Sequence, residues 1–548
     1  MPLQKNQVLT LRVERLSSDG SGVAHSPDGE TVFIPGAAPG DEARVRIVKD
    51  CKRYAFGILD EVLTPSPDRI PVDCAVAGPC GGCSLRHLDY AAELRAKQEN
   101  VADAFARIGG LDVPVLSIVG SPEVNRYRNK VQFPVGVDKS GKPCIGFYAG
   151  RTHRIVPCPD CRLQPGVLNE IGNALCAFFA EKGIQPYSEE TGRGLVRHIF
   201  LRRGAHSGQI MVCLVCTRAK LPSAEELCTR LKAQFAEITT ILLNVNAKNT
   251  NVILGTETHT LYGPGYIEDT LCGVPVQLGP LSFYQVNTLA AEQLYGIAAQ
   301  YAQLTPDDLL LDLYCGMGTI GLSMAAHCRE LIGVEIVPEA IESAKANAAR
   351  MGADVAAKSR FFCADAGQAA TRLAAEGLHP DIVMLDPPRK GCDEATLSAV
   401  VRMSPRRVVY VSCNPATAAR DAAWLEQNGY HAEKVQPVDL FPRTRHCEAV
   451  LLLTKLHVDR HIEVEVSMDE LDVTAAESKA TYDQIRYYVW EHYQLKVSNL
   501  YIAQVKQKHG IIERENYHKA KNENAKQPKC PKEKEDAIVE ALKHFQMI

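Results

Sequence analysis

The sequence lacks any apolar run that approaches the roughly 18 residues needed by a membrane-spanning helix. Its first residues, Met1-Pro2-Leu3-Gln4-Lys5-Asn6, contain no apolar signal-peptide core. Nineteen cysteines, an odd number, would be costly as free thiols in a secreted protein. We therefore expect a cytoplasmic protein whose cysteines are metal ligands, catalytic thiols or small buried residues.

An excess of positive charge is also absent, because the formal net charge is −4. No global basic field indicates nucleic acid, so any RNA-binding surface must be local. The sequence has no internal repeats and no long low-complexity segment. Because 548 residues exceed one ordinary core, we expect roughly two to four domains.

Residues 1–62 predict a small β-barrel. Apolar and polar side chains alternate over 8–13 and 43–48, and turn-forming glycines separate such runs. The end of this segment interleaves cations with aromatic rings, a pattern that suits the phosphates and bases of RNA. The residues concerned are Arg44, Arg46, Lys49, Lys52, Arg53, Tyr54 and Phe56. A solvated strand face explains the same pattern equally well.

Three further segments are expected beyond this barrel. Residues 63–290 mix strand and helix patterns and predict a central α+β domain. Residues 291–456 alternate strands with helices, which predicts an α/β fold with a doubly wound, Rossmann-like parallel sheet. Residues 457–548 predict a helical extension that is basic over 506–534, where nine Lys or Arg face four Glu. The extension suits nucleic acid or a solvated polar tail about equally.

A glycine-rich turn in the third segment indicates a nucleotide-type cofactor. The apolar strand 309–314 runs into Cys315-Gly316-Met317-Gly318-Thr319-Ile320-Gly321, and glycines there let a ligand approach a helix N-terminus. The next strand ends in Glu335, nineteen residues after Gly316, where a carboxylate can accept both ribose hydroxyls of an adenosine. NAD and S-adenosylmethionine both satisfy this fingerprint.

Two later strand ends carry reactive side chains. One strand ends in Asp386-Pro387-Pro388-Arg389, and the missing aromatic after the prolines argues against methylation of an exocyclic amine. Another ends in Ser412-Cys413-Asn414-Pro415, at the sheet edge where α/β proteins bind ligands. A thiolate such as Cys413 can add to C6 of uracil and activate C5 for methylation. The adduct then needs a general base, and Glu448 and His446 are equal candidates by residue type.

Together these motifs resemble the RNA (uracil-5)-methyltransferase family, and the ribosomal RNA branch fits best. Asp-Pro-Pro-Arg, Ser-Cys-Asn-Pro and the run from Phe441 to Glu448 carry the resemblance. It implies methylation of one or more uridines of 23S ribosomal RNA, with Cys413 as nucleophile and Glu448 as base. It also implies that S-adenosylmethionine is held by Gln285, Tyr314, Glu335 and Asp386. The first segment resembles an RNA-binding TRAM domain, and we expect a monomer.

Five cysteines indicate a metal site. Cys74, Cys80 and Cys83 form a Cys-x5-Cys-Gly-Gly-Cys run, and Cys158 and Cys161 form a nearby pair. A zinc ion on the two Cys-x2-Cys pairs and a four-iron cluster on Cys74, Cys80, Cys83 and Cys161 both fit the residues. The family resemblance implies the second, a [4Fe-4S] cluster.

Three other functions compete with this hypothesis. A transfer RNA uridine methyltransferase uses the same chemistry, and an NAD-linked iron–sulfur oxidoreductase uses the same glycine turn. A non-catalytic RNA-binding protein on this fold is disfavoured, because both Cys413 and Glu448 are present.

Overall fold

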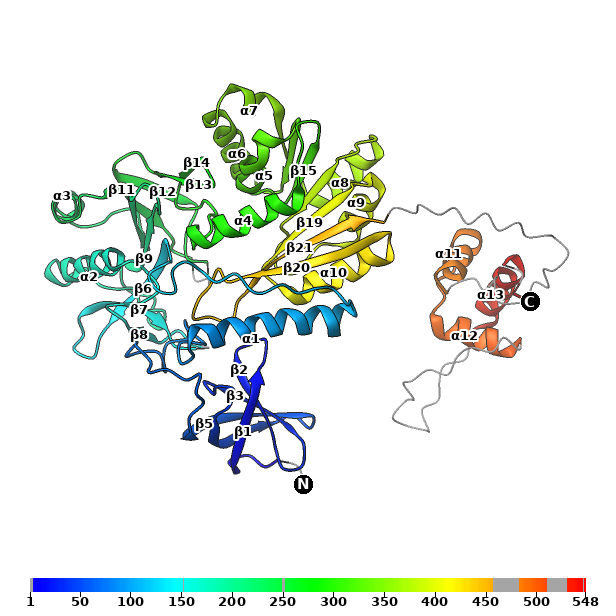
Figure 1. Cartoon of the computed structure of the whole chain (residues 1–548), viewed down its shortest axis with the longest axis horizontal. Helices are drawn as coiled ribbons and strands as arrows, with labels where there is room; N and C mark the ends of the chain where they lie inside the picture. Colours follow the sequence, from blue (N-terminus) through cyan, green and yellow to red (C-terminus); the bar gives the residue numbers. More distant parts are fainter. Residues whose placement is uncertain (1–2, 151, 249–251, 457–481, 510–529, 546) are drawn as a thin grey trace. The chain divides into compact units, whose positions relative to one another are not determined.

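The computed structural model describes residues 3–150, 152–248, 252–456, 482–509, 530–545 and 547–548. The chain divides into two compact units, Met1–His457 and Val458–Ile548 (Figure 1). Among the described residues, no helix combines the length and apolar character needed to cross a bilayer.

The first unit begins with the predicted barrel, which is closed by five strands in the order β1-β2-β3-β5-β4. These strands are β1 Val8–Leu16, β2 Ser21–His25, β3 Thr31–Pro35, β4 Glu42–Asp50 and β5 Tyr54–Thr64. Two cations of the expected basic face are paired with carboxylates, Arg44 with Glu61 at 2.8 Å and Arg46 with Asp60 at 3.0 Å. The positive charge of this face is therefore smaller than its sequence indicates.

Helix α1 Tyr90–Asp103 follows the barrel and continues into the π-helical segment Ala104–Gly109. The side chain of Asp89 begins α1 by accepting hydrogen bonds from two backbone amides of the first turn. The helix contacts both the barrel strand β1 and the distant strand β20 Tyr430–Val438 (Figure 1). Its inward face includes two buried charges, Glu93 and Lys97.

The central part of the unit contains a seven-stranded sheet in the order β12-β11-β10-β9-β6-β7-β8. Its strands are β6 Lys130–Val137, β7 Pro143–Tyr148, β8 Ile155–Pro157, β9 Val196–Arg203, β10 Ile210–Cys216, β11 Ile238–Val245 and β12 Glu257–Tyr262. Two helices, α2 Gly166–Glu181 and α3 Ala224–Gln234, contribute to the same apolar core. The hairpin of β13 Ile267–Leu271 and β14 Val274–Leu278 then leads to α4 Thr288–Ala302.

The third sheet has the order β17-β16-β15-β18-β19-β21-β20 and is Rossmann-like, as predicted. Its strands are β15 Leu309–Leu313, β16 Glu330–Glu335, β17 Ser359–Cys363, β18 Ile382–Leu385, β19 Arg407–Ser412, β20 and β21 Glu448–Lys455. Its helices are α5 Thr319–Met324, α6 Pro338–Arg350, α7 Ala353–Lys358, α8 Ala366–Ala375, α9 Glu394–Met403 and α10 Pro415–Gln427. The strands β15 to β19 are parallel, whereas β21 runs antiparallel to both β19 and β20.

The strand order reverses between β15 and β18, because the chain moves outward from β15 to β17 before it returns to β18. Such a switch point opens a crevice at the carboxyl ends of the parallel strands. Tyr314, Asp386 and Cys413 each directly follow one of these strands, and Glu335 ends another. The topology therefore gathers the predicted site residues along one edge.

The second unit contains three helices in its described residues: α11 Tyr482–Tyr493, α12 Asn499–Lys508 and α13 Lys532–His544. They share a small apolar core that includes Ile485, Val489, Ile502, Val505, Ile538 and Leu542. A solvated tail has no such core, so that interpretation is wrong for these helices. Most of the basic run over 506–534 lies outside the described residues.

Candidate active site

Antiparallel pairing of β19 with β21 brings the two predicted catalytic residues together. Ser412 at the end of β19 is paired with Ala449 of β21. Because the two strands are antiparallel, Cys413, which follows Ser412, lies beside Glu448, which precedes Ala449. Asp386 follows the neighbouring strand β18, which is parallel to β19. The three side chains interact electrostatically with one another. A thiol and two carboxyls therefore share one end of the sheet.

Burial controls the ionisation of both carboxyls. Burial raises the pKa of Glu448 to about 8, with a further contribution from the negative charge of Asp386, whereas the Arg389 guanidinium opposes the rise. Burial likewise raises the pKa of Asp386 to about 7. A general base with a pKa near the working pH combines adequate basicity with an adequate ionised fraction. Glu448 meets this requirement.

The Cys413 thiol is half-buried and its pKa is raised to about 11, first by burial and then by the charges of Glu448 and Asp386. Arg389 lowers the same pKa and so favours the thiolate. Without substrate the thiol is therefore protonated at neutral pH. Nucleophilic attack by Cys413 requires that this proton leave as substrate binds.

His446, the rival base, has the opposite shift. Burial lowers the pKa of its imidazole to about 4, and the nearby cations Arg389, Arg445, Lys97 and Arg128 lower it further. Its ring lies edge-on to Phe441, with centroids 6.1 Å apart. A base this weak holds a proton poorly at neutral pH, which favours Glu448 over His446.

The glycine-rich turn has the geometry of a ligand cradle. Tyr314, Gly316 and Gly318 have positive φ angles of 66°, 55° and 78°. A Cβ placed on Gly316 would meet no atom within 4 Å, so the space over this residue is open. The carboxylate of Glu335 lies beside it and accepts hydrogen bonds from the amides of Gly316 at 3.1 Å and Val337 at 3.0 Å.

Asp312 adds an unpartnered polar atom to this cradle. One carboxyl oxygen accepts from the Gly321 amide at 3.0 Å, whereas the other is buried and has no partner in the described structure. Burial raises the pKa of Asp312 to about 8. Open space over Gly316, an unpartnered oxygen and the Glu335 carboxylate together fit a ligand with hydroxyl or amine donors, such as an adenosine.

The other predicted cofactor residue, Gln285, reaches this region from outside the third sheet. Its side chain forms a hydrogen bond with the Tyr295 hydroxyl, which also lies 3.3 Å from Thr319 Oγ1 at the start of α5. Its backbone carbonyl accepts from Asn129 Nδ2 at 2.7 Å. The structure thus brings Gln285, Tyr314, Glu335 and Asp386 to one edge of the sheet.

Sequence reasoning missed Arg202, which fixes the segment that leads to Gln285. Its guanidinium donates to the carbonyls of Gly279 at 2.8 Å and Ser282 at 2.7 Å, and its side chain is almost fully buried. The available signal was an arginine directly after the apolar run 199–201 of β9, but its partners lie 77 and 80 residues away.

All five cysteines of the predicted metal site line one cavity of about 170 Å³, together with Arg86, Arg128 and Arg162. A hydrogen bond from Cys158 lowers the pKa of Cys161 to about 7. Among the described residues, however, no three His, Cys, Asp or Glu side chains are arranged to hold a metal ion. The cysteines are of the ligand type that zinc ions and iron–sulfur clusters both use. The metal site therefore stays a prediction, whether as a zinc ion or as a four-iron cluster.

Comparison with known proteins identifies the family. The profile described as tRNA (Uracil-5-)-methyltransferase matches residues 207–456, and the TRAM domain profile matches residues 2–59. An uncharacterized RNA methyltransferase of Halalkalibacterium halodurans is 43% identical over 453 residues, covering 82% of this chain and 98% of that protein. The chain belongs to the RNA (uracil-5)-methyltransferase family and carries an N-terminal TRAM domain.

Two further relatives agree with this assignment. An uncharacterized RNA methyltransferase of Clostridium tetani is 40% identical over 454 residues, covering 83% of this chain and 98% of the relative. The crystal structure of Pyrococcus abyssi tRNA (uracil-54, C5)-methyltransferase with S-adenosyl-L-homocysteine has a TM-score of 0.65 and 26% identity. It covers 81% of this chain and 100% of that one. The family match favours a methyltransferase over the NAD-linked oxidoreductase.

The raised pKa of Glu448 predicts a pH-dependent cost to stability. The folded chain keeps its carboxyl protonated up to a pKa of about 8, whereas the unfolded chain ionises near 4.5. The favourable contribution of the protonated Glu448 carboxyl to folding stability is complete below pH 4.5 and is lost as pH rises through about 8. Glu448→Gln, which cannot ionise, should therefore melt at a higher temperature than wild type at pH 9 and at a similar one at pH 4.5.

The control is Glu342→Gln, because that side chain is 73% exposed on α6. Its melting temperature should follow wild type across the same range. Parallel curves for wild type and Glu448→Gln would contradict the buried, protonated state of Glu448.

Proposed function

We propose that the protein methylates C5 of one or more uridines in 23S ribosomal RNA, with S-adenosylmethionine as methyl donor. The observation that carries this proposal is that Cys413 and Glu448 each adjoin the Ser412–Ala449 pair of β19 and β21. Thiol-dependent methylation of C5 needs a nucleophile and a separate base at one uracil ring, and Cys413 and Glu448 supply both.

The chain's own residues divide the reaction into two steps. The Cys413 thiolate adds to C6 of uracil, and the electron pair of the C5–C6 bond moves toward O4, which makes C5 nucleophilic. S-adenosylmethionine, when bound, supplies the methyl group that C5 attacks. Glu448 then removes the C5 proton, and the electron pair left on C5 re-forms the double bond as the Cys413–C6 bond breaks. Arg389 lowers the pKa of both groups and so favours their ionised forms.

Four residues are proposed to hold the donor at the other end of the crevice. Glu335 would accept from the ribose hydroxyls, and Tyr314 and Gln285 would line the same space. Asp386 lies between this cradle and Cys413, because its charge acts on Asp312 as well as on the thiol. It would therefore contact either the donor or the target base.

The motif set favours 23S ribosomal RNA, and transfer RNA is the second candidate. The resemblance of these motifs to the ribosomal RNA branch supports the first candidate. The Pyrococcus abyssi transfer RNA enzyme nevertheless resembles this chain over 81% of its length. Overall architecture therefore does not separate the two substrates.

Mapping of 5-methyluridine by mass spectrometry tests the substrate directly. Deletion of the gene should remove the modification from one or two positions of 23S ribosomal RNA, and the purified protein should restore it. Loss from transfer RNA, with ribosomal RNA unchanged, would establish the second candidate instead.

We further propose that Cys74, Cys80, Cys83 and Cys161 hold a [4Fe-4S] cluster. This proposal is supported by the four thiols lining one cavity and by thiolates being the usual ligands of iron–sulfur clusters. Methyl transfer needs no electron, so the cluster's role would be to order this region or to position RNA.

Two substitutions separate the catalytic steps. Cys413→Ala should abolish both turnover and the covalent RNA adduct, because no other group attacks C6. Glu448→Gln should form the adduct and keep it, because the C5 proton is not removed. Denaturing gel electrophoresis of labelled RNA measures both outcomes, with Cys144→Ala, a half-buried thiol of β7, as control. Full activity of Cys413→Ala would refute the mechanism.

Anaerobic purification tests the cluster. The protein should be brown, with broad visible absorption and about four irons per chain, and Cys80→Ser should lose the colour. A colourless wild-type protein with one zinc per chain would remove the cluster and support the zinc site.

A further inference from the structure

Glu448, the proposed general base, lies where the turn between β20 and β21 ends. Glu448 pairs with Val438 where the two strands meet the turn, which spans residues 439–447. The path of this turn therefore determines where the Glu448 backbone starts. A hairpin turn at a protein surface is usually held by its own residues and by water.

Here, four consecutive carbonyls of the turn are each held by a different part of the first unit. The donors come from the start of α4, from α1, from the segment before β6 and from the segment before α1. Asn287 Nδ2 donates to Leu440 at 3.1 Å, Lys97 Nζ to Phe441 at 3.2 Å, the Tyr127 hydroxyl to Pro442 at 3.0 Å and the Leu85 amide to Arg443 at 3.1 Å.

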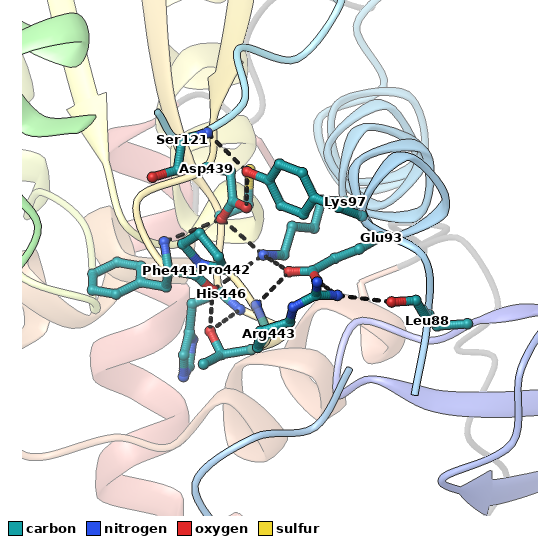
Figure 2. A network of polar contacts seen from close by, with 12 residues as sticks. Leu88, Glu93, Lys97, Ser121, Asp439, Phe441, Pro442, Arg443 and His446 are labelled. Carbon is teal, nitrogen blue, oxygen red and sulfur yellow. Dashed lines mark hydrogen bonds and ion pairs between the residues drawn. The ribbon is translucent and has the colours of Figure 1, made fainter. Parts of the chain in front are cut away.

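Buried charges reinforce the same turn, as Figure 2 shows. Lys97, which is 1% exposed, donates to Glu93 Oε1 at 2.7 Å and to Asp439 Oδ1 at 2.8 Å. Asp439 also accepts from the Tyr90 hydroxyl at 2.9 Å, and Glu93 accepts from the Arg443 amide at 2.7 Å. Buried ion pairs are weak sources of stability, and the best-attested reason to keep them is conformational specificity.

The network continues to the residues just before Glu448. The Phe441 carbonyl that Lys97 contacts also accepts from Thr444 Oγ1 at 2.8 Å, and Thr444 Oγ1 in turn accepts from the His446 amide at 3.4 Å. Arg443 has a positive φ of 69°, a conformation that arginine rarely adopts without tertiary support. Contacts from outside the turn therefore add to its own hydrogen bonds in fixing its path.

We propose that Lys97 and Tyr127 are positioning residues for proton removal from C5: they hold the 439–447 turn so that Glu448 stays opposite Cys413. This inference rests on the proposed function of that pair. Neither residue reaches the reacting atoms itself. Loosening the turn displaces the base but leaves Cys413 on β19, so adduct formation continues while adduct release slows.

Tyr127→Phe is the sharpest test, because it removes one hydroxyl and adds no atoms. Tyr430→Phe is its matched control. Tyr430 is buried at the end of β20 that lies away from the turn, and its hydroxyl donates to the Pro405 carbonyl at 2.8 Å. Both variants lose a buried hydrogen bond to a proline carbonyl, and Tyr127→Phe also loses the hydrogen bond between its hydroxyl and the Arg128 side chain. Only the Tyr127 hydrogen bond reaches the 439–447 turn.

The measurement is single-turnover kinetics on target RNA, with adduct formation and adduct release followed separately on denaturing gels. Tyr127→Phe should slow release about five- to tenfold, as expected for one lost buried hydrogen bond, and leave formation within about twofold. Tyr430→Phe should leave both rates unchanged. Lys97→Met, assayed at a temperature where circular dichroism shows the native fold, should slow release further, since two buried carboxylates lose their partner.

Equal effects of Tyr127→Phe on both steps, or equal behaviour of the two tyrosine variants, would overturn the inference while leaving the proposed function intact. A wild-type protein that forms no adduct, and a Glu448→Gln variant that traps none, would overturn the proposed function and the inference with it.

Discussion

The insertion of β21 between β19 and β20 is the constraint on which the proposed chemistry depends. In a wholly parallel sheet, the carboxyl ends of strands lie at one edge and the amino ends at the other. Because β21 runs antiparallel to β19, Glu448 at the start of β21 lies beside Cys413, which directly follows β19. Glu448 and Cys413 meet for this reason, although 35 residues separate them in the chain.

Burial gives the edge its electrostatic character. Asp312, Asp386 and Glu448 all have pKa values raised to between about 7 and about 8, and burial is the largest cause for each. Arg389 is the cation that acts on both Glu448 and Cys413. Such a site holds protons in the free protein and can release them when a substrate changes the balance of charge.

Much of this arrangement could be predicted from the sequence, because local patterns determine it. Apolar strands that are directly followed by Tyr314, Asp386 and Cys413 locate the sheet edge, and the glycines after Tyr314 locate the cradle. The five cysteines that line one cavity were also identified by their spacing alone.

Contacts between distant segments could not be predicted. Lys97 and Asp439 lie 342 residues apart, and no periodicity links them. Lys97 follows Glu93 by one helical turn, but this spacing does not separate a buried pair from an exposed one. The pairing of Arg46 with Asp60, which reduces the basic face of the barrel, depends on the register of β4 and β5 in the same way.

Tritium release measures whether this end of the sheet adds a thiol to uracil and removes the C5 proton, as we propose. Target RNA labelled with tritium at C5 of uridine would be incubated with the protein and S-adenosylmethionine. We expect one tritium released to water for each methyl group incorporated, and none with Cys413→Ala. Methyl incorporation without tritium release would show that another atom is methylated and would refute the proposed mechanism.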